Sequence, residues 1–169
     1  MPFSHPFNRP YILDLVRQCH CNTVLDLGIG YGAIGAYLKY NLPHTILDGI
    51  EIFAGYQNHP LAHWDLYRKI WLGDFTRMAI PPVYDGILAI DVIEHLDKVQ
   101  GKKQILRLAA IARKVFIVSV PLGEYPQGAF EGNVYETHKS TWYESDFAPL
   151  GLKLVAQNEI IGVFASRRK

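Results

Sequence analysis

The stretch TVLDLGIGYG, from Thr23 to Gly32, decides the fold of this 169-residue chain. An apolar run that carries Asp26 ends in three glycines at alternating positions, the first of them Gly28. Glycine has no Cβ, so such a turn bends sharply and lets the backbone approach a ligand closely. The apolar stretch 33–40 that follows predicts a helix. The pattern therefore predicts a ligand site at the carboxyl end of a strand, beside a helix N-terminus.

Size and composition are those of an ordinary globular domain, and we expect one domain over residues 1–169. The chain is 49% hydrophobic and 20% charged, with a net charge of +1 at pH 7. This charge gives no overall footprint for nucleic acid and no attraction to a membrane surface. No stretch reaches the roughly 18 apolar residues that a membrane helix needs. Met1–Pro6 lacks the layout of a signal peptide, so a cytoplasmic protein is expected.

Strand and helix patterns alternate along most of the chain. Apolar spacing predicts helices over 11–17, 33–40, 60–69, 98–113 and 142–149, and strands over 23–27, 45–52, 70–75, 84–90, 115–120, 152–156 and 160–165. The last two strands flank a short polar turn, so they are expected to pair antiparallel. The sequence therefore predicts an α/β fold: a doubly wound, mostly parallel seven-stranded sheet with a C-terminal antiparallel hairpin.

The glycine-rich stretch resembles the first motif of the class I S-adenosylmethionine-dependent methyltransferases, which reads acidic-x-Gly-x-Gly-x-Gly. It stands here as Asp26-Leu27-Gly28-Ile29-Gly30-Tyr31-Gly32. The resemblance covers roughly residues 10–165, because an antiparallel last strand is also typical of that family. It implies a Rossmann-like fold, S-adenosylmethionine as cofactor and methyl transfer to a small-molecule acceptor.

A dinucleotide-binding turn is the competing interpretation, because Gly30 to Gly35 reads G-x-G-x-x-G. In that fingerprint the glycines hold a pyrophosphate, which favours helix N–H groups and little negative charge nearby. S-adenosylmethionine has no phosphate, and it carries a sulfonium and an ammonium. The Asp26 carboxylate therefore favours the methyl donor over NAD.

Acidic residues after later strands extend the predicted cofactor site. Glu51 ends the second strand, and a carboxylate there can accept two hydrogen bonds from a ribose diol, with Ile52 against the adenine. In the family that the chain resembles, an acidic residue after the third strand meets the adenine amino group and its neighbour donates a backbone N–H to the ring. Asp74 and Phe75 hold these positions. The predicted cofactor contacts are Asp26, Gly28, Gly30, Gly32, Glu51, Ile52, Asp74, Phe75 and Asp91.

The run Asp91-Val92-Ile93-Glu94-His95-Leu96 predicts where the methyl acceptor lies. It follows the fourth strand, and similar runs occur in small-molecule O-methyltransferases. His95 and His138 are the candidate catalytic bases, since imidazole titrates near neutral pH. A structural, hydrogen-bonded role for His95 stays open. The aromatic-rich loop 121–140 either walls the substrate or packs onto the core.

Two alternatives remain. The same run, with the later stretches 119–121 and 138–144, resembles small-RNA 3′-terminal 2′-O-methyltransferases, which implies Asp91, Glu94, His95 and His138 as ligands of a divalent metal. However, Asp91 stands where that family has glutamate, and the net charge does not favour RNA. The main interpretation therefore includes no metal and no nucleic acid. The second alternative is a non-catalytic module that binds S-adenosylmethionine.

Overall fold

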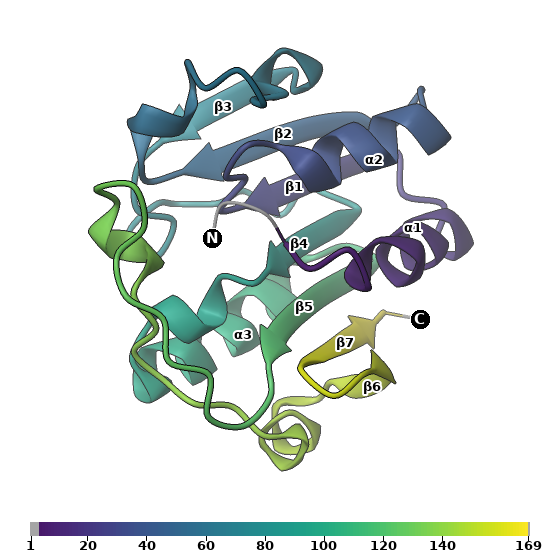
Figure 1. Cartoon of the computed structure of the whole chain (residues 1–169). Helices are drawn as coiled ribbons and strands as arrows, with labels where there is room; N and C mark the ends of the chain where they lie inside the picture. Colours follow the sequence, from purple (N-terminus) through teal and green to yellow (C-terminus); the bar gives the residue numbers. More distant parts are fainter. Residues whose placement is uncertain (1–3, 169) are drawn as a thin grey trace.

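The computed structural model describes residues 4–168, so Met1–Phe3 of the N-terminal stretch and Lys169 lie outside the described residues. A seven-stranded sheet with the order β3-β2-β1-β4-β5-β7-β6 forms its centre (Figure 1). The strands are β1 Thr23–Leu27, β2 Ile46–Glu51, β3 Lys69–Leu72, β4 Gly86–Ile90, β5 Val115–Pro121, β6 Lys153–Gln157 and β7 Ile161–Arg167. Strands β1 to β5 pair in parallel, whereas β7 is antiparallel to both β5 and β6. The predicted sheet and its C-terminal hairpin are confirmed.

Helices cover both faces of the sheet (Figure 1). They are α1 Asn8–Gln18, α2 Ala33–Asn41 and α3 Lys98–Ile111. Buried residues of α1 and α2 belong to the same core cluster as Val115 and Ile117 of β5, while those of α3 belong to the cluster of Phe116 and Val118, because successive side chains of a strand point to opposite faces. Every residue of β4 and β5 is buried, as expected for parallel strands covered on both sides. No helix within residues 4–168 has the length and apolar character needed to cross a membrane.

The direction of the strand order reverses between β1 and β4. In such sheets the loops diverge at this point and leave a crevice outside the carboxyl ends of the strands. The glycine turn follows β1, and Val92 follows β4. Gly28 has a φ of 66°, and a Cβ on it would come within 2.6 Å of Cγ2 of Val92. A side chain at position 28 would therefore collide with Val92 at the base of the crevice.

The prediction of a helix over 60–69 is wrong. This segment contains the 3₁₀ turn Trp64–Leu66 and ends at Lys69, the first residue of β3. The backbone N–H of His63 and the indole N–H of Trp64 donate to carbonyls of the glycine turn, at 2.7 and 2.8 Å. Because these groups bind a distant part of the chain, the segment lies over the glycine turn instead of forming hydrogen bonds along its own axis.

The prediction of a helix over 142–149 is also wrong. Two 3₁₀ turns, Glu144–Asp146 and Ala148–Leu150, occupy this region. Pro149 has no N–H to donate, and the Asp146 carboxylate accepts the backbone N–H of Tyr143 at 2.9 Å. Local side-chain bonding of this kind competes with a regular helix.

Candidate active site

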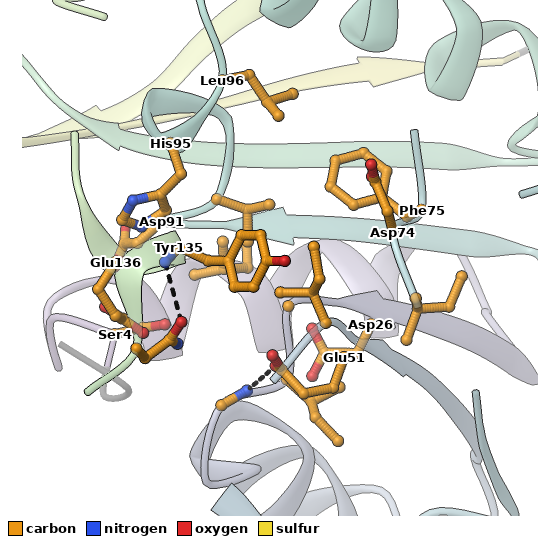
Figure 2. A pocket seen from close by; sticks show the side chains of 18 of the residues that line it. Ser4, Asp26, Glu51, Asp74, Phe75, Asp91, His95, Leu96, Tyr135 and Glu136 are labelled. Atoms are coloured by element: carbon orange, nitrogen blue, oxygen red, sulfur yellow. Dashed lines mark hydrogen bonds between the residues drawn. The ribbon is translucent and has the colours of Figure 1, made fainter. Parts of the chain in front are cut away.

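A cavity of about 240 Å³ opens at the carboxyl ends of β1 to β4 (Figure 2). The predicted site residues that line it are Asp26, Gly28, Gly30, Glu51, Ile52, Asp74, Phe75, Asp91 and His95. Two predicted residues lie elsewhere. Gly32 begins α2 with a φ of 81° and faces His63, so it shapes the turn from outside the cavity. His138 lines a smaller neighbouring cavity.

Glu51 ties the end of β2 to the glycine turn. Its side chain is buried, Oε2 accepts the backbone N–H of Gly30 at 2.9 Å (the dashed line at Glu51 in Figure 2) and Oε1 accepts that of Phe53 at 2.8 Å. Burial raises the pKa of this carboxyl, and the backbone N–H groups oppose the rise. Each carboxylate oxygen has a second lone pair. Glu51 can therefore still accept hydrogen bonds from a ligand in the cavity.

Asp26 lies on the floor of the cavity. It is buried, and its Oδ2 accepts the hydroxyl of Tyr67 at 2.7 Å. Burial raises the pKa of Asp26 to about 7, the Tyr67 hydrogen bond opposes the rise and the charge of Glu51 adds to it. A cationic group in the cavity would favour the ionised carboxylate.

Asp91 has a left-handed backbone, with a φ of 54°, which is uncommon outside glycine. Its Oδ1 accepts the hydroxyl of Ser119 at 2.6 Å, and Oδ2 accepts the backbone N–H of His5 at 3.2 Å. Asn8, itself fully buried, donates to the same carboxylate and to Ser119. Asp91 therefore anchors the start of the described chain against the sheet while it lines the cavity.

Asp74 and Phe75 form the opposite end of the cavity in Figure 2. Oδ1 of Asp74 accepts the backbone N–H of Thr76 at 2.9 Å and its hydroxyl at 2.7 Å. Oδ2 lies 3.4 Å from Nε of Arg77. Asp74 thus fixes its own turn, and it also lines the cavity.

The loop over 121–140 forms one wall of the cavity. Tyr135 and Glu136 line it, and Tyr56 donates its hydroxyl to Oε1 of Glu136 at 2.7 Å. Tyr31 donates its hydroxyl to Glu131 at 2.7 Å, so the loop is bonded to the glycine turn. Trp142, in contrast, is fully buried in the core. Sequence reasoning missed Glu136, because nothing in the spacing of this aperiodic loop distinguishes it.

Glu94, His95 and His138 gather beside the cavity. One ligand atom of each lies within 4.8 Å of the other two, and the two imidazole centroids are 4.9 Å apart. Burial lowers the pKa of His95 to about 4, with the charge of His138 adding to this effect, and burial also lowers that of His138. Burial and the charge of Asp91 raise the pKa of Glu94 well above its usual range. Both imidazoles are therefore neutral at pH 7, as a proton acceptor requires.

Solved structures of similar architecture are known, although sequence comparisons find no relative. No protein-family model matches the sequence, and a comparison with curated proteins finds no significant match. Among solved structures, the mitomycin 7-O-methyltransferase MmcR has a TM-score of 0.66 at 18% identity, over 96% of this chain and 53% of that one. The 1,6-didemethyltoxoflavin-N1-methyltransferase of Burkholderia thailandensis has a TM-score of 0.69 at 17% identity, over 95% and 77% of the two chains.

The methyltransferase domain of bacterial CtHen1 has a TM-score of 0.69 at 17% identity, over 97% of this chain and 100% of that one. The chain has the class I methyltransferase fold. The fold that the glycine turn predicted is therefore confirmed. The chain spans about half of the length of MmcR, so the fold accounts for nearly all of this chain and only part of that enzyme.

Proposed function

We propose that this protein is an S-adenosylmethionine-dependent methyltransferase that acts on a small-molecule acceptor. The observation that carries the proposal is the bond from the Gly30 N–H to Glu51. A dinucleotide pyrophosphate would need the N–H groups of this turn. Here a carboxylate accepts one of them, which places negative charge where a phosphate would bind.

The charge of the cavity supports the same choice. Five carboxyl groups and two basic side chains line it, namely Asp26, Glu51, Asp74, Asp91 and Glu136 against Arg77 and Lys139. S-adenosylmethionine carries a sulfonium and an ammonium against one carboxylate, whereas a dinucleotide carries two negative phosphates. The structure of the toxoflavin methyltransferase, a protein of similar fold, contains bound S-adenosylhomocysteine.

The residues divide the work of binding and reaction. Glu51 holds the ribose diol, Asp74 and Phe75 hold the adenine, and Asp26 faces the cationic end. When bound, S-adenosylmethionine supplies an electrophilic methyl group on its sulfonium. His95, neutral at pH 7, accepts the proton that an acceptor O–H or N–H releases. The walls orient the acceptor toward the methyl group, and positioning of this kind lowers a barrier by several kcal/mol, up to about 7–11.

Turnover tests this proposal. Incubation with S-adenosylmethionine and a pool of small hydroxyl and amino compounds is expected to yield S-adenosylhomocysteine and a methylated product by mass spectrometry. His95→Ala is expected to lower the rate at least about 100-fold, the usual contribution of a positioned base. Binding of the cofactor with no product from any pool would instead support the non-catalytic module.

We predict that S-adenosylhomocysteine binds more tightly as the pH rises through the Asp26 pKa of about 7. Below this pKa the carboxyl is protonated, and the ammonium group of S-adenosylhomocysteine must displace that proton, which costs up to about tenfold in affinity per pH unit. Calorimetry one unit below and one unit above the pKa measures the change. Asp26→Asn is expected to abolish it. An unchanged slope in Asp26→Asn would remove Asp26 from this role.

A second candidate is the metal-dependent RNA 2′-O-methyltransferase-like enzyme, which the cluster of Glu94, His95 and His138 favours. One carboxylate and two imidazoles suit a divalent transition metal. Asp91, the fourth ligand expected from the resemblance, is instead bonded to Ser119 and Asn8. Within residues 4–168 the candidate metal group therefore contains three of the four expected side chains.

For this candidate we predict Mn²⁺ binding that His138→Ala weakens at least about tenfold, because one of three ligands is lost. Titration by electron paramagnetic resonance measures the affinity. His44→Ala, an exposed histidine outside both cavities, is the matched control. Equal Mn²⁺ affinity in the two variants would exclude this metal site.

A further inference from the structure

A second cavity of about 190 Å³ lies beside the first. The two share Ser4, Asp91 and His95 in their linings. Figure 2 shows these three residues together at the end of the first cavity that lies away from Asp74 and Phe75. A molecule in the second cavity would therefore meet the first cavity at His95, far from the proposed adenine site.

The walls of the second cavity are apolar along most of their length. Pro6, Pro121, Ile160 and Ile161 provide these walls, and Tyr125 adds an aromatic ring. None of the described residues that line it is a lysine or an arginine. A phosphate or carboxylate in this cavity would meet neither a lysine nor an arginine among the described residues and would lie beside the Asp91 carboxyl group, so an anionic molecule is disfavoured.

A polar end closes this cavity where Glu94, His95 and His138 meet. The Glu94 side chain is 1% exposed, and its Oε2 has no hydrogen-bond partner among the described residues. A buried polar atom without a partner costs about 1–3 kcal/mol, so such atoms in native proteins usually pair with a protein group, an ordered water or a bound molecule. A protic group of a molecule in this cavity can supply the missing hydrogen-bond partner of the Glu94 carboxyl group.

We propose that this second cavity is the acceptor chamber, and that it takes a small neutral molecule with an apolar body and one protic group, O–H or N–H, at its reactive end. The proposal rests on the proposed methyl transfer. Ligand pockets for drug-sized molecules measure about 300–1,000 Å³, so a chamber of about 190 Å³ suits a fragment of single-ring size. The apolar walls hold the ring, and Glu94 with the two histidines holds the protic group beside the first cavity.

The test uses three probes with one apolar body: 4-ethylphenol, 4-ethylaniline and the anion 4-ethylbenzoate. Each is titrated into protein with and without S-adenosylhomocysteine, while NMR follows the imidazole ring resonances. A neutral probe is expected to shift the resonances of His95 and His138 and to leave those of His20 and His44 unchanged.

Ile160→Trp narrows the chamber at a position that is 37% exposed, and it is expected to weaken probe binding at least tenfold. Leu154→Trp, at a 39% exposed position outside both cavities, is the matched control and is expected to bind the probe like wild type. Both variants are expected to keep wild-type affinity for S-adenosylhomocysteine.

Three results would overturn the chamber: no shift of His138 with either neutral probe, equal binding of 4-ethylbenzoate, or equal probe affinity in Ile160→Trp and Leu154→Trp. If wild-type protein does not bind S-adenosylhomocysteine, a different proposal fails. That result would contradict the proposed function, while the probe shifts measured without S-adenosylhomocysteine would still decide whether the chamber binds such molecules.

Discussion

Glu51→Gln is expected to weaken S-adenosylhomocysteine binding by more than tenfold. The carboxylate accepts N–H groups of Gly30 and Phe53, and under the proposed function it also accepts the ribose hydroxyls. Hydrogen bonds to a charged group contribute about 1.5–3 kcal/mol each, and about 1.4 kcal/mol is a factor of ten in affinity. The amide loses the charge and turns a donor NH₂ toward one of these partners. Calorimetry at a temperature where both proteins are folded measures the loss.

The empty protein is expected to lose part of its stability and to remain folded. The amide oxygen can still accept the Gly30 N–H, but the NH₂ group then faces the Phe53 N–H, which loses its acceptor. Glu159→Gln, at an exposed position in the turn before β7, is the control and should bind like wild type. Wild-type affinity in Glu51→Gln would contradict the ribose role. A lower melting temperature with unchanged affinity would make Glu51 a structural residue only.

Gly35→Ala is expected to lower the free energy of unfolding by about 2 kcal/mol, within the usual cost of overpacking. A Cβ at this position would overlap the hydroxyl and Cζ of Tyr67 and lie 2.7 Å from its Cε2. Tyr67 is buried and donates to Asp26, so it cannot move without breaking that hydrogen bond. The gain in helix propensity from glycine to alanine, about 1 kcal/mol, offsets only part of the cost. Urea denaturation measures the net change.

Two further variants distinguish the overlap with Tyr67 from the general effect of a glycine-to-alanine change on stability. Gly128→Ala, with no atom within 4 Å of its Cβ, is expected to leave stability unchanged. Tyr67→Phe removes the overlapped hydroxyl, so the double variant with Gly35→Ala should be more stable than the sum of the two single changes. Strict additivity, or equal stability of Gly35→Ala and Gly128→Ala, would contradict the predicted contact.

Much of the fold could be predicted from the sequence because its signals are local. The strand over 23–27 has the bounds that its apolar run and the following glycines predict, and the C-terminal hairpin follows from two apolar runs around a polar turn. The segment 60–69 could not be predicted in this way. Its shape depends on hydrogen bonds to the glycine turn, and those partners lie about 30 residues away in the sequence.

Some residues of the candidate site could likewise be predicted from the sequence, and others could not. Glu51 and Asp74 follow strands whose carboxyl ends must meet at one edge of a parallel sheet, so their place in the cavity follows from the topology. Glu136 and the partners of Asp91 could not be found, because an aperiodic loop and the start of the described chain bring them there. Asp91 has a left-handed backbone, and its carboxylate is held by these non-local hydrogen bonds.

The central claim is that the glycine turn and Glu51 form a site for S-adenosylmethionine. Calorimetric titration with S-adenosylhomocysteine, and in parallel with NAD, tests it most directly. The account predicts micromolar binding of S-adenosylhomocysteine and no binding of NAD. Binding of NAD alone would show that the turn holds a pyrophosphate despite the Glu51 carboxylate, and binding of neither would remove the cofactor from the proposed function.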